Sequence, residues 1–323
     1  MPQSMANGIP RDIINGVAIS SLIFLVSGWL PVFGFLGLLS LPVPIFYYRA
    51  KLGRRYSLII LAAVFAVIMT VIGEFSPDLM FVTGLLLTGF VLCELVEKNM
   101  SVEQTVLFTG ILVFLAGTLA LIIYSNMAGI QLGALLSAYV KKNLMLSLKL
   151  YKEVGMPAEQ VQALSRSMET IQYYLIRILP AICGAFLLIV AWITLLGARM
   201  VLISKGVGFP DFGKLNTWQA PEILVWVVIG SGLLLLLPNN PARLIALNVL
   251  ILLLTVYFFH GIAIISYFFE SKNLPVALRF LIYSMIAIWN LLLVFVVGLG
   301  FFDMWVDFRR LKQPKKPDDD LDF

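Results

Sequence analysis

The chain has 323 residues, of which 60% are apolar and 13% are charged, with a net charge of +5. A soluble domain carries about a quarter charged residues, so this chain has too little polar surface to cover a water-soluble particle. No stripe of lysine and arginine interleaved with aromatic residues accompanies the small positive charge, which argues against a nucleic-acid partner. We therefore predict an all-α, polytopic bundle of transmembrane helices in a lipid bilayer, because the apolar runs are too long for barrel strands.

The first 127 residues predict a group of transmembrane helices. Arg11 and Asp12 lead into a long apolar run without a small-residue cleavage site, so we expect this segment to stay in the membrane. Pro42 and Pro44 interrupt the second run, because a proline removes a backbone donor and kinks or breaks a helix. Such a break is either a turn between helices or, as in transporters, a pointer to a binding site. The apolar runs are 13–30, 31–48, 57–73, 79–96 and 105–125.

Clusters of positive charge bear on the orientation. Arg49, Lys51, Arg54 and Arg55 have no acid among them, which marks this segment as cytoplasmic by the positive-inside rule. The tail at 309–316 is basic as well. We count an odd number of crossings between the two segments, which places them on opposite sides although both are basic. Either the amphipathic stretch after residue 128 partly re-enters the membrane, or one of the expected spans does not cross it fully.

Residues 128–171 have a different character. Apolar side chains recur every three or four residues from Leu132 to Ile171, with charged side chains between them. This spacing predicts an insert of two amphipathic helices outside the hydrocarbon core, divided near Pro157. The insert either lies on anionic lipid or docks a protein partner. Its lysines are Lys141, Lys142, Lys149 and Lys152.

Further apolar runs complete the membrane part and bring the expected number of spans to about eight or nine. These runs are 171–198, 222–237, 244–269 and 277–302. We expect the charged end of the chain to be disordered. The predicted regions are transmembrane helices in 1–127, the amphipathic insert in 128–171, transmembrane helices in 172–304 and the charged tail in 305–323.

The sequence contains no pattern that carries catalysis. With a single histidine it has neither an H-E-x-x-H motif nor a histidine-based metal cluster, and the glycines at 206 and 208 lack the Lys-Ser/Thr of a phosphate-binding loop. Cys93 and Cys183 lie within apolar runs and suit buried structural thiols. We expect no enzyme activity, no metal and no cofactor, so transport would draw its energy from a partner protein or an ion gradient.

Polar residues inside apolar runs are the candidates for ligand binding. A polar group in hydrocarbon costs several kcal/mol unless it is paired, so Asn248, His260 and Asn290 are expected to face the bundle interior. His260 and Asn290 fall near the middle of adjacent predicted helices. They either hydrogen-bond between those helices or face a bound solute.

The last predicted helix leads into a patterned set of charges. On a continuous helix, Asp303, Asp307 and Arg310 lie along one face, where Asp307 and Arg310 form a bridge, while Trp305 and Arg309 pair on another. An interfacial anchor explains the tryptophan and the arginines. It does not explain an aspartate directly against the apolar run. We therefore expect these five residues to act as a docking site for a membrane or cytoplasmic protein partner.

The ending from 298 to 310, Gly-x-Gly-x-x-Asp-x-Trp-x-Asp-x-Arg-Arg, resembles that of the DUF2232 (YybS-like) family of membrane proteins. The preceding helix with Gly261 and the basic helix pair near 45–60 are compatible with this resemblance, which covers most of the chain. The family is distantly similar in architecture to the substrate-binding S components of energy-coupling-factor vitamin transporters. The resemblance supplies no ligand residues.

Two functions are expected from these observations. The first is a small-solute-binding transporter subunit in the bacterial inner membrane, with His260, Asn290 and Asn248 around the solute. The second is a non-transporting scaffold of an envelope complex, in which the insert and the ending are interaction surfaces. A cavity of a few hundred Å³ would favour the first. A close-packed interior with mutually paired polar residues would favour the second.

Overall fold

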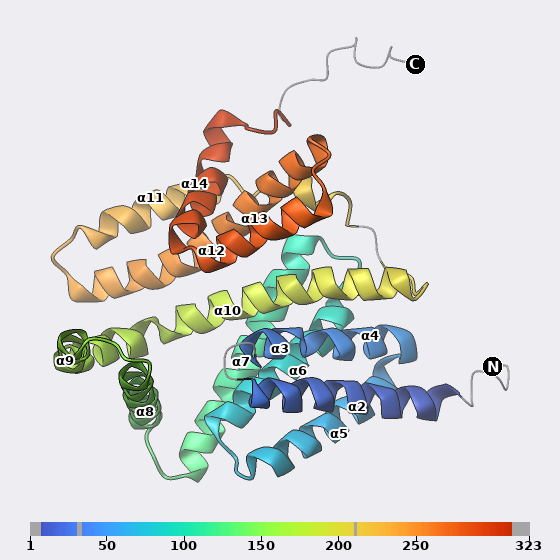
Figure 1. The fold of residues 1–323 in the computed structure, drawn as a ribbon, viewed down its shortest axis with the longest axis horizontal. Helices are drawn as coiled ribbons and strands as arrows, with labels where there is room; N and C mark the ends of the chain where they lie inside the picture. Colours follow the sequence, from blue (N-terminus) through green and yellow to red (C-terminus); the bar gives the residue numbers. More distant parts are fainter. Residues whose placement is uncertain (1–7, 31–33, 210–211, 312–323) are drawn as a thin grey trace. The chain divides into compact units, whose positions relative to one another are not determined.

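The computed structural model describes residues 8–30, 34–209 and 212–311, and within these ranges the chain is helical and contains no strand (Figure 1). The predicted all-α polytopic class is confirmed, because six helices are long and apolar enough to cross a bilayer and a bent pair of shorter helices makes up to a seventh. This number is close to, and slightly below, the expected count. Most of the predicted disordered tail lies outside the described residues. The helices are α2 (Gly8–Trp29), α3 (Gly34–Ser40), α4 (Pro42–Leu52), α5 (Arg54–Ile72), α6 (Pro77–Val96), α7 (Val102–Met127), α8 (Leu132–Glu153), α9 (Ala158–Arg166), α10 (Met168–Ser204), η1 (Leu215–Thr217), α11 (Ile223–Leu235), α12 (Asn240–Ser271), α13 (Val276–Ile288) and α14 (Asn290–Val306).

The chain forms two compact units, Met1–Asp211 and Phe212–Phe323. The predicted divisions after residues 127 and 171 do not separate compact units, because α8 and α9 pack against α10 within the first unit. The predicted C-terminal group of spans is divided instead, with α10 in the first unit and α12 to α14 in the second.

The first unit has its core between α4, α5 and α6. Gly89 of α6 faces the backbone carbonyl of Pro42 so closely that a Cβ there would collide with it, so these two helices meet backbone to backbone. Pro42 stands in the first turn of α4, where its missing N–H is not needed. The predicted interruption of 31–48 is thus a junction between two short helices, and residues 31–33 lie outside the described residues. The core includes Leu41, Ile45, Ile60, Val64, Leu85, Leu86 and Val190.

Arg49 near the end of α4 is buried and ties that helix to the end of α6. Its guanidinium donates to Glu94 over 2.7 Å and to Glu97 over 2.8 Å. Burial lowers the pKa of Arg49, but the hydrogen bonds to the two glutamates outweigh burial and raise the pKa above its ordinary value. Lys51 also pairs, with Asp12. The basic segment is therefore partly neutralised by acids that are distant in sequence.

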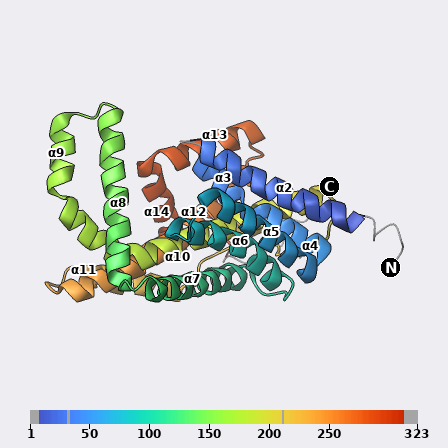
Figure 2. The same ribbon diagram turned by 90° about the horizontal axis from the view of Figure 1, so that it is seen from below.

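The predicted amphipathic insert is helical, but its second helix, α9, has only nine residues. Residues from Met168 onward belong to the 37-residue α10. The start of α8 is fixed by two hydrogen bonds, from Tyr139 to Asp78 over 2.6 Å and from Gln172 to Ser137 over 2.8 Å. Figure 2 shows α8 and α9 side by side, joined by a short loop.

The second unit is built on α12, a helix of 32 residues that packs against α11 and α14. The continuous helix predicted at 277–302 is instead a bent pair, because the chain bends by 105° between α13 and α14. The break lies at Trp289, whose φ of −98° and ψ of 106° are extended and not helical. At 13 and 17 residues, each half is shorter than the roughly 20 residues that a span requires.

These lengths also change the count of crossings between the two basic segments. The predicted span at 222–237 is the 13-residue α11, which is too short to count as a crossing. Five candidate spans follow Gly53, or six if the bent pair crosses as one broken span. Six crossings, an even number, would place both basic segments on the same side, as the positive-inside rule requires.

Candidate functional site

The helices α12 and α14 cross where each carries a glycine. A Cβ at Gly261 would collide with the backbone carbonyl of Val296, and a Cβ at Gly300 would collide with that of Tyr257. A glycine inside a helix costs about 1 kcal/mol relative to alanine, so these positions need a reason beyond helix formation. The reason is the close crossing, which brings the neighbouring His260 and Asp303 within reach of each other.

The end of α14 turns the chain back toward this crossing. Asp307 adopts a left-handed conformation with φ of 46°, and its N–H donates to the Asp303 carbonyl over 2.8 Å. Arg310 is left-handed as well, with φ of 51°. The prediction of a continuous helix through Arg310, with one face shared by Asp303, Asp307 and Arg310, is therefore wrong. Since the helix stops at Val306, the side chain of Arg309 folds back toward α12.

His260, Asp303 and Arg309 form a buried cluster in which each touches the other two. The three residues are 3%, 1% and 3% exposed, respectively. Arg309 Nη2 donates to Asp303 Oδ2 over 2.9 Å and lies 2.9 Å from His260 Nε2, while His260 Nε2 lies 3.1 Å from Asp303 Oδ2. The second carboxylate oxygen of Asp303 accepts from the Phe308 N–H over 2.9 Å. Both oxygens of the aspartate are therefore satisfied inside the protein.

Two opposite partners meet at His260 Nε2. The guanidinium of Arg309 can only donate to it, over 2.9 Å, whereas the carboxylate oxygen of Asp303, 3.1 Å away, can only accept from it. The tautomer of the ring decides which of the two contacts is a hydrogen bond. His260 Nδ1 is buried and has no hydrogen-bond partner among the described residues. The cluster thus presents two unused polar atoms among the described residues, His260 Nδ1 and Arg309 Nε.

The same arginine fixes the loop that precedes α11. Arg309 Nη1 donates to the carbonyl of Asn216 over 2.8 Å and to that of Trp218 over 3.0 Å. The Trp218 ring stands edge-to-face against the His260 ring, with centroids 5.9 Å apart. The loop is held from its other side by Glu270, which accepts from Asn216. The loop, α12 and the turn after α14 therefore meet at this cluster.

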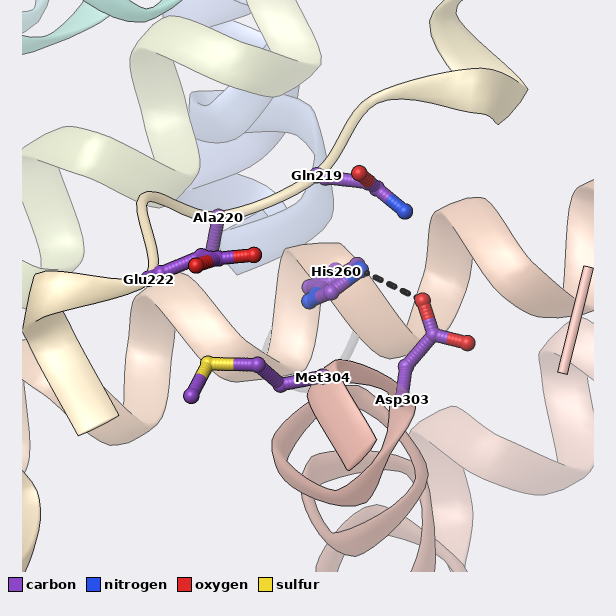
Figure 3. Close-up of a pocket in the computed structure, with 6 residues that line it drawn as sticks. All are labelled: Gln219, Ala220, Glu222, His260, Asp303 and Met304. Carbon is purple, nitrogen blue, oxygen red and sulfur yellow. Dashed lines mark hydrogen bonds and ion pairs between the residues drawn. The ribbon is translucent and has the colours of Figure 1, made fainter. Parts of the chain in front are cut away.

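A small pocket opens beside the histidine. In Figure 3, Gln219 and Glu222 of the loop lie on one side of His260, and Asp303 and Met304 of α14 lie on the other. His260 directs one ring nitrogen at Asp303 and the other away from it, toward the part of the pocket near Glu222 and Met304. The pocket leaves about 20 Å³ for the centres of water-sized molecules. One water needs about 10–15 Å³ on this measure, so one or two such groups fit.

The structure separates the predicted ligand residues. His260 lines the pocket. Asn290 is exposed at the first residue of α14, directly after the break, and does not line it. Asn248 donates to the carbonyl of Leu244 in its own helix over 2.8 Å and is not a pocket residue either. The expectation that His260 and Asn290 lie at matching depths failed because α13 and α14 are not one helix.

The predicted docking residues divide as well. Asp303 and Arg309 are buried in the cluster, so their side chains offer no surface to a partner. Trp305 and Arg310 are exposed, and Asp307 is half-buried. Sequence reasoning missed Gln219, which carried no signal in its loop. Glu222, the residue before α11, also lines the pocket.

The arrangement can bind a small polar group but shows no built metal centre. Among the described residues, no group of three histidine, cysteine, aspartate or glutamate side chains is placed to hold a metal ion. Asp303 is already saturated by Arg309 and Phe308. What remains for a ligand is hydrogen bonding with His260 Nδ1 and with the polar side chains of the loop.

The comparisons with known proteins bear on the class of the molecule. Residues 18–304, most of the chain, match the family described as predicted membrane protein (DUF2232). No curated protein and no solved structure matches the chain.

Proposed function

We propose that this chain, which belongs to the DUF2232 family of predicted membrane proteins, is the small-solute-binding subunit of a membrane transporter. It is an integral membrane protein with several apolar helices. The His260 pocket is the proposed binding site. A location in the bacterial inner membrane, dependence on a partner protein for energy, and the absence of an enzymatic reaction are parts of the same proposal.

One observation carries the proposal, namely an ion cluster buried within apolar helices with an unused ring nitrogen beside a pocket. Ionisable residues inside membrane segments are costly and commonly mark the path of a substrate or ion. A cluster with only a structural role would be expected to use every polar atom, because an unpaired buried donor or acceptor costs about 1–3 kcal/mol. His260 Nδ1 is such an atom. A solute that forms a hydrogen bond with it would offset that cost.

The size of the pocket limits what the solute can be. Sites for drug-sized and vitamin-sized molecules are roughly 300–1,000 Å³. The space beside His260 accepts only one or two water-sized groups. We therefore propose that the site takes the polar end of a solute, such as a hydroxyl or carbonyl, and that the rest of the solute lies outside the pocket.

The test is to purify the protein in mild detergent and identify retained small molecules by mass spectrometry. We expect a polar compound that is lost at least tenfold in His260→Ala. Gln219→Ala is the second variant, since it removes a pocket side chain without touching the ion cluster, and we expect it to weaken retention too. Asn290→Ala is the matched control and should retain the compound as wild type does. Equal retention in all four proteins would refute the site.

A scaffold role is the second candidate, and two observations favour it, since the pocket beside His260 is far smaller than a few hundred Å³ and the polar residues beside it are mutually paired. His260, Asp303 and Arg309 are paired with one another, as expected of a polar lock between helices. If no small molecule is retained and proteins co-purify instead, the scaffold is the better account. In that case Trp305 and Arg310, which are exposed, are the residues to substitute.

A further inference from the structure

The outer surface of α8 carries two neighbouring stripes. Its four lysines are all exposed. They gather on one flank because Lys149 and Lys152 follow Lys142 and Lys141 by seven and eleven residues, which is two and three turns of the helix. Beside them runs an apolar stripe at a spacing of four, made of Leu146 at 49%, Leu150 at 58% and Val154 at 86% exposure. Exposed apolar patches of this kind mark contact surfaces. The lysines are Lys141, Lys142, Lys149 and Lys152.

Another face of α8 is already used. Val140 is buried, and the hydrogen bond from Gln172 to Ser137 holds this face against α10. Tyr139, on the side of the apolar stripe but nearer the start of the helix, donates to Asp78 of α6. These contacts fix the rotation of α8 about its axis and leave the lysines and the stripe from Leu146 onward exposed.

The direction of α8 fits a membrane surface. In Figure 1 the candidate spans α7 and α10 run in different directions within the plane of the picture, whereas α8 and α9 are seen end-on. Figure 2 shows α8 from the side, across the direction of α10. A bilayer that both spans cross has its normal between their two directions. The axis of α8, which runs across both spans, then lies parallel to the membrane plane.

We propose that α8 lies on the bilayer surface and binds anionic lipid headgroups with its lysine flank. The apolar stripe would enter the boundary of the acyl chains while the lysine stems reach outward to phosphates, as in interfacial amphipathic helices. The charge is complementary, since the helix has four lysines and a single acid, Glu153, which lies 3.9 Å from Lys149. The neighbouring α9 adds Glu159 and Arg166, which offset each other.

The test uses the full chain in nanodiscs made either of phosphatidylcholine alone or of phosphatidylcholine with one third phosphatidylglycerol. Hydrogen exchange of peptides covering 141–156 is read by mass spectrometry. We expect exchange at least tenfold slower in the anionic discs, with the difference reduced by 1 M salt because salt screens exposed charges. Each lysine near an anionic surface contributes about fivefold to binding.

Two matched variants separate lipid binding from a general charge effect. Replacing the four lysines of α8 by glutamine should abolish the dependence on phosphatidylglycerol. Replacing four exposed lysines elsewhere should leave it intact, and thermal unfolding should show that both variants are folded. Equal exchange in the two kinds of disc overturns the proposal. So does protection that appears only when another protein is added. The control lysines are Lys98, Lys205, Lys214 and Lys272.

Discussion

The substitution Asp303→Asn tests the buried cluster most sharply, because it removes a charge with almost no change of volume. Asp303 Oδ2 accepts from Arg309 and lies 3.1 Å from His260. Asparagine keeps one oxygen, which can still accept from the Phe308 N–H. Asparagine cannot neutralise the positive charge of the Arg309 guanidinium, and Arg309 is only 3% exposed.

The expected magnitude follows from this burial. Breaking a buried ion pair by removing one partner costs about 3–5 kcal/mol, because the other charge is left uncompensated in a medium of low polarity. Arg309 retains two carbonyl acceptors, Asn216 and Trp218, which hold its other nitrogen. These carbonyls do not carry a full negative charge. We therefore expect Asp303→Asn to lower the free energy of unfolding by about 3 kcal/mol, at the lower end of this range.

The assay is reversible denaturation in detergent followed by tryptophan fluorescence, with a double-mutant cycle. Arg309→Met removes the buried charge, so the double variant should be about 2 kcal/mol more stable than the sum of the two single effects predicts. Asp307→Asn is the control, since Asp307 lies outside the cluster, and it should cost no more than about 1 kcal/mol. Strict additivity of Asp303→Asn and Arg309→Met would refute the reasoning.

Two further predictions test the helix crossing and the base of α8. Gly261→Ala should destabilise the second unit by about 1–3 kcal/mol, because its Cβ meets the Val296 carbonyl. Gly298→Ala is the control and should not destabilise the unit, because no atom lies within 4 Å of the added carbon. Equal losses of stability in the two variants on thermal unfolding would contradict the close crossing. Burial and the hydrogen bond to Asp78 raise the pKa of Tyr139 from 10.0 to about 12, so its contribution to stability is complete below pH 10 and is lost as the pH rises toward 12. Tyr139→Phe should therefore be less stable than wild type at pH 8, with a difference that shrinks at higher pH; a constant difference would argue against this coupling.

The class of the molecule could be predicted from the sequence because composition alone decides it. A chain with 13% charged residues cannot cover a soluble particle, whatever its fold. The apolar runs also located most of the helices. The break at Trp289 had no signal, since neither proline nor glycine stands there, and it moved Asn290 out of the expected interior.

The candidate site was predictable only in part. His260 could be singled out as a polar residue within an apolar run, and Asp303 as an acidic residue at the end of another apolar run. Their contact depends on the crossing at Gly261 and Gly300, which is a property of two distant segments. Arg309 was expected outside because a left-handed residue at the end of α14 is usually glycine, whereas here it is an aspartate.

The most direct test of the central claim uses the fact that the chain has a single histidine. Labelling that residue with ¹⁵N, in protein purified without a histidine tag and placed in nanodiscs, gives one pair of ring signals by NMR. The structure predicts that the Nε2 signal moves in Asp303→Asn and in Arg309→Met, because both residues contact Nε2, but stays in place in Asp307→Asn. Ring signals unchanged by either cluster substitution would contradict the buried His260–Asp303–Arg309 cluster.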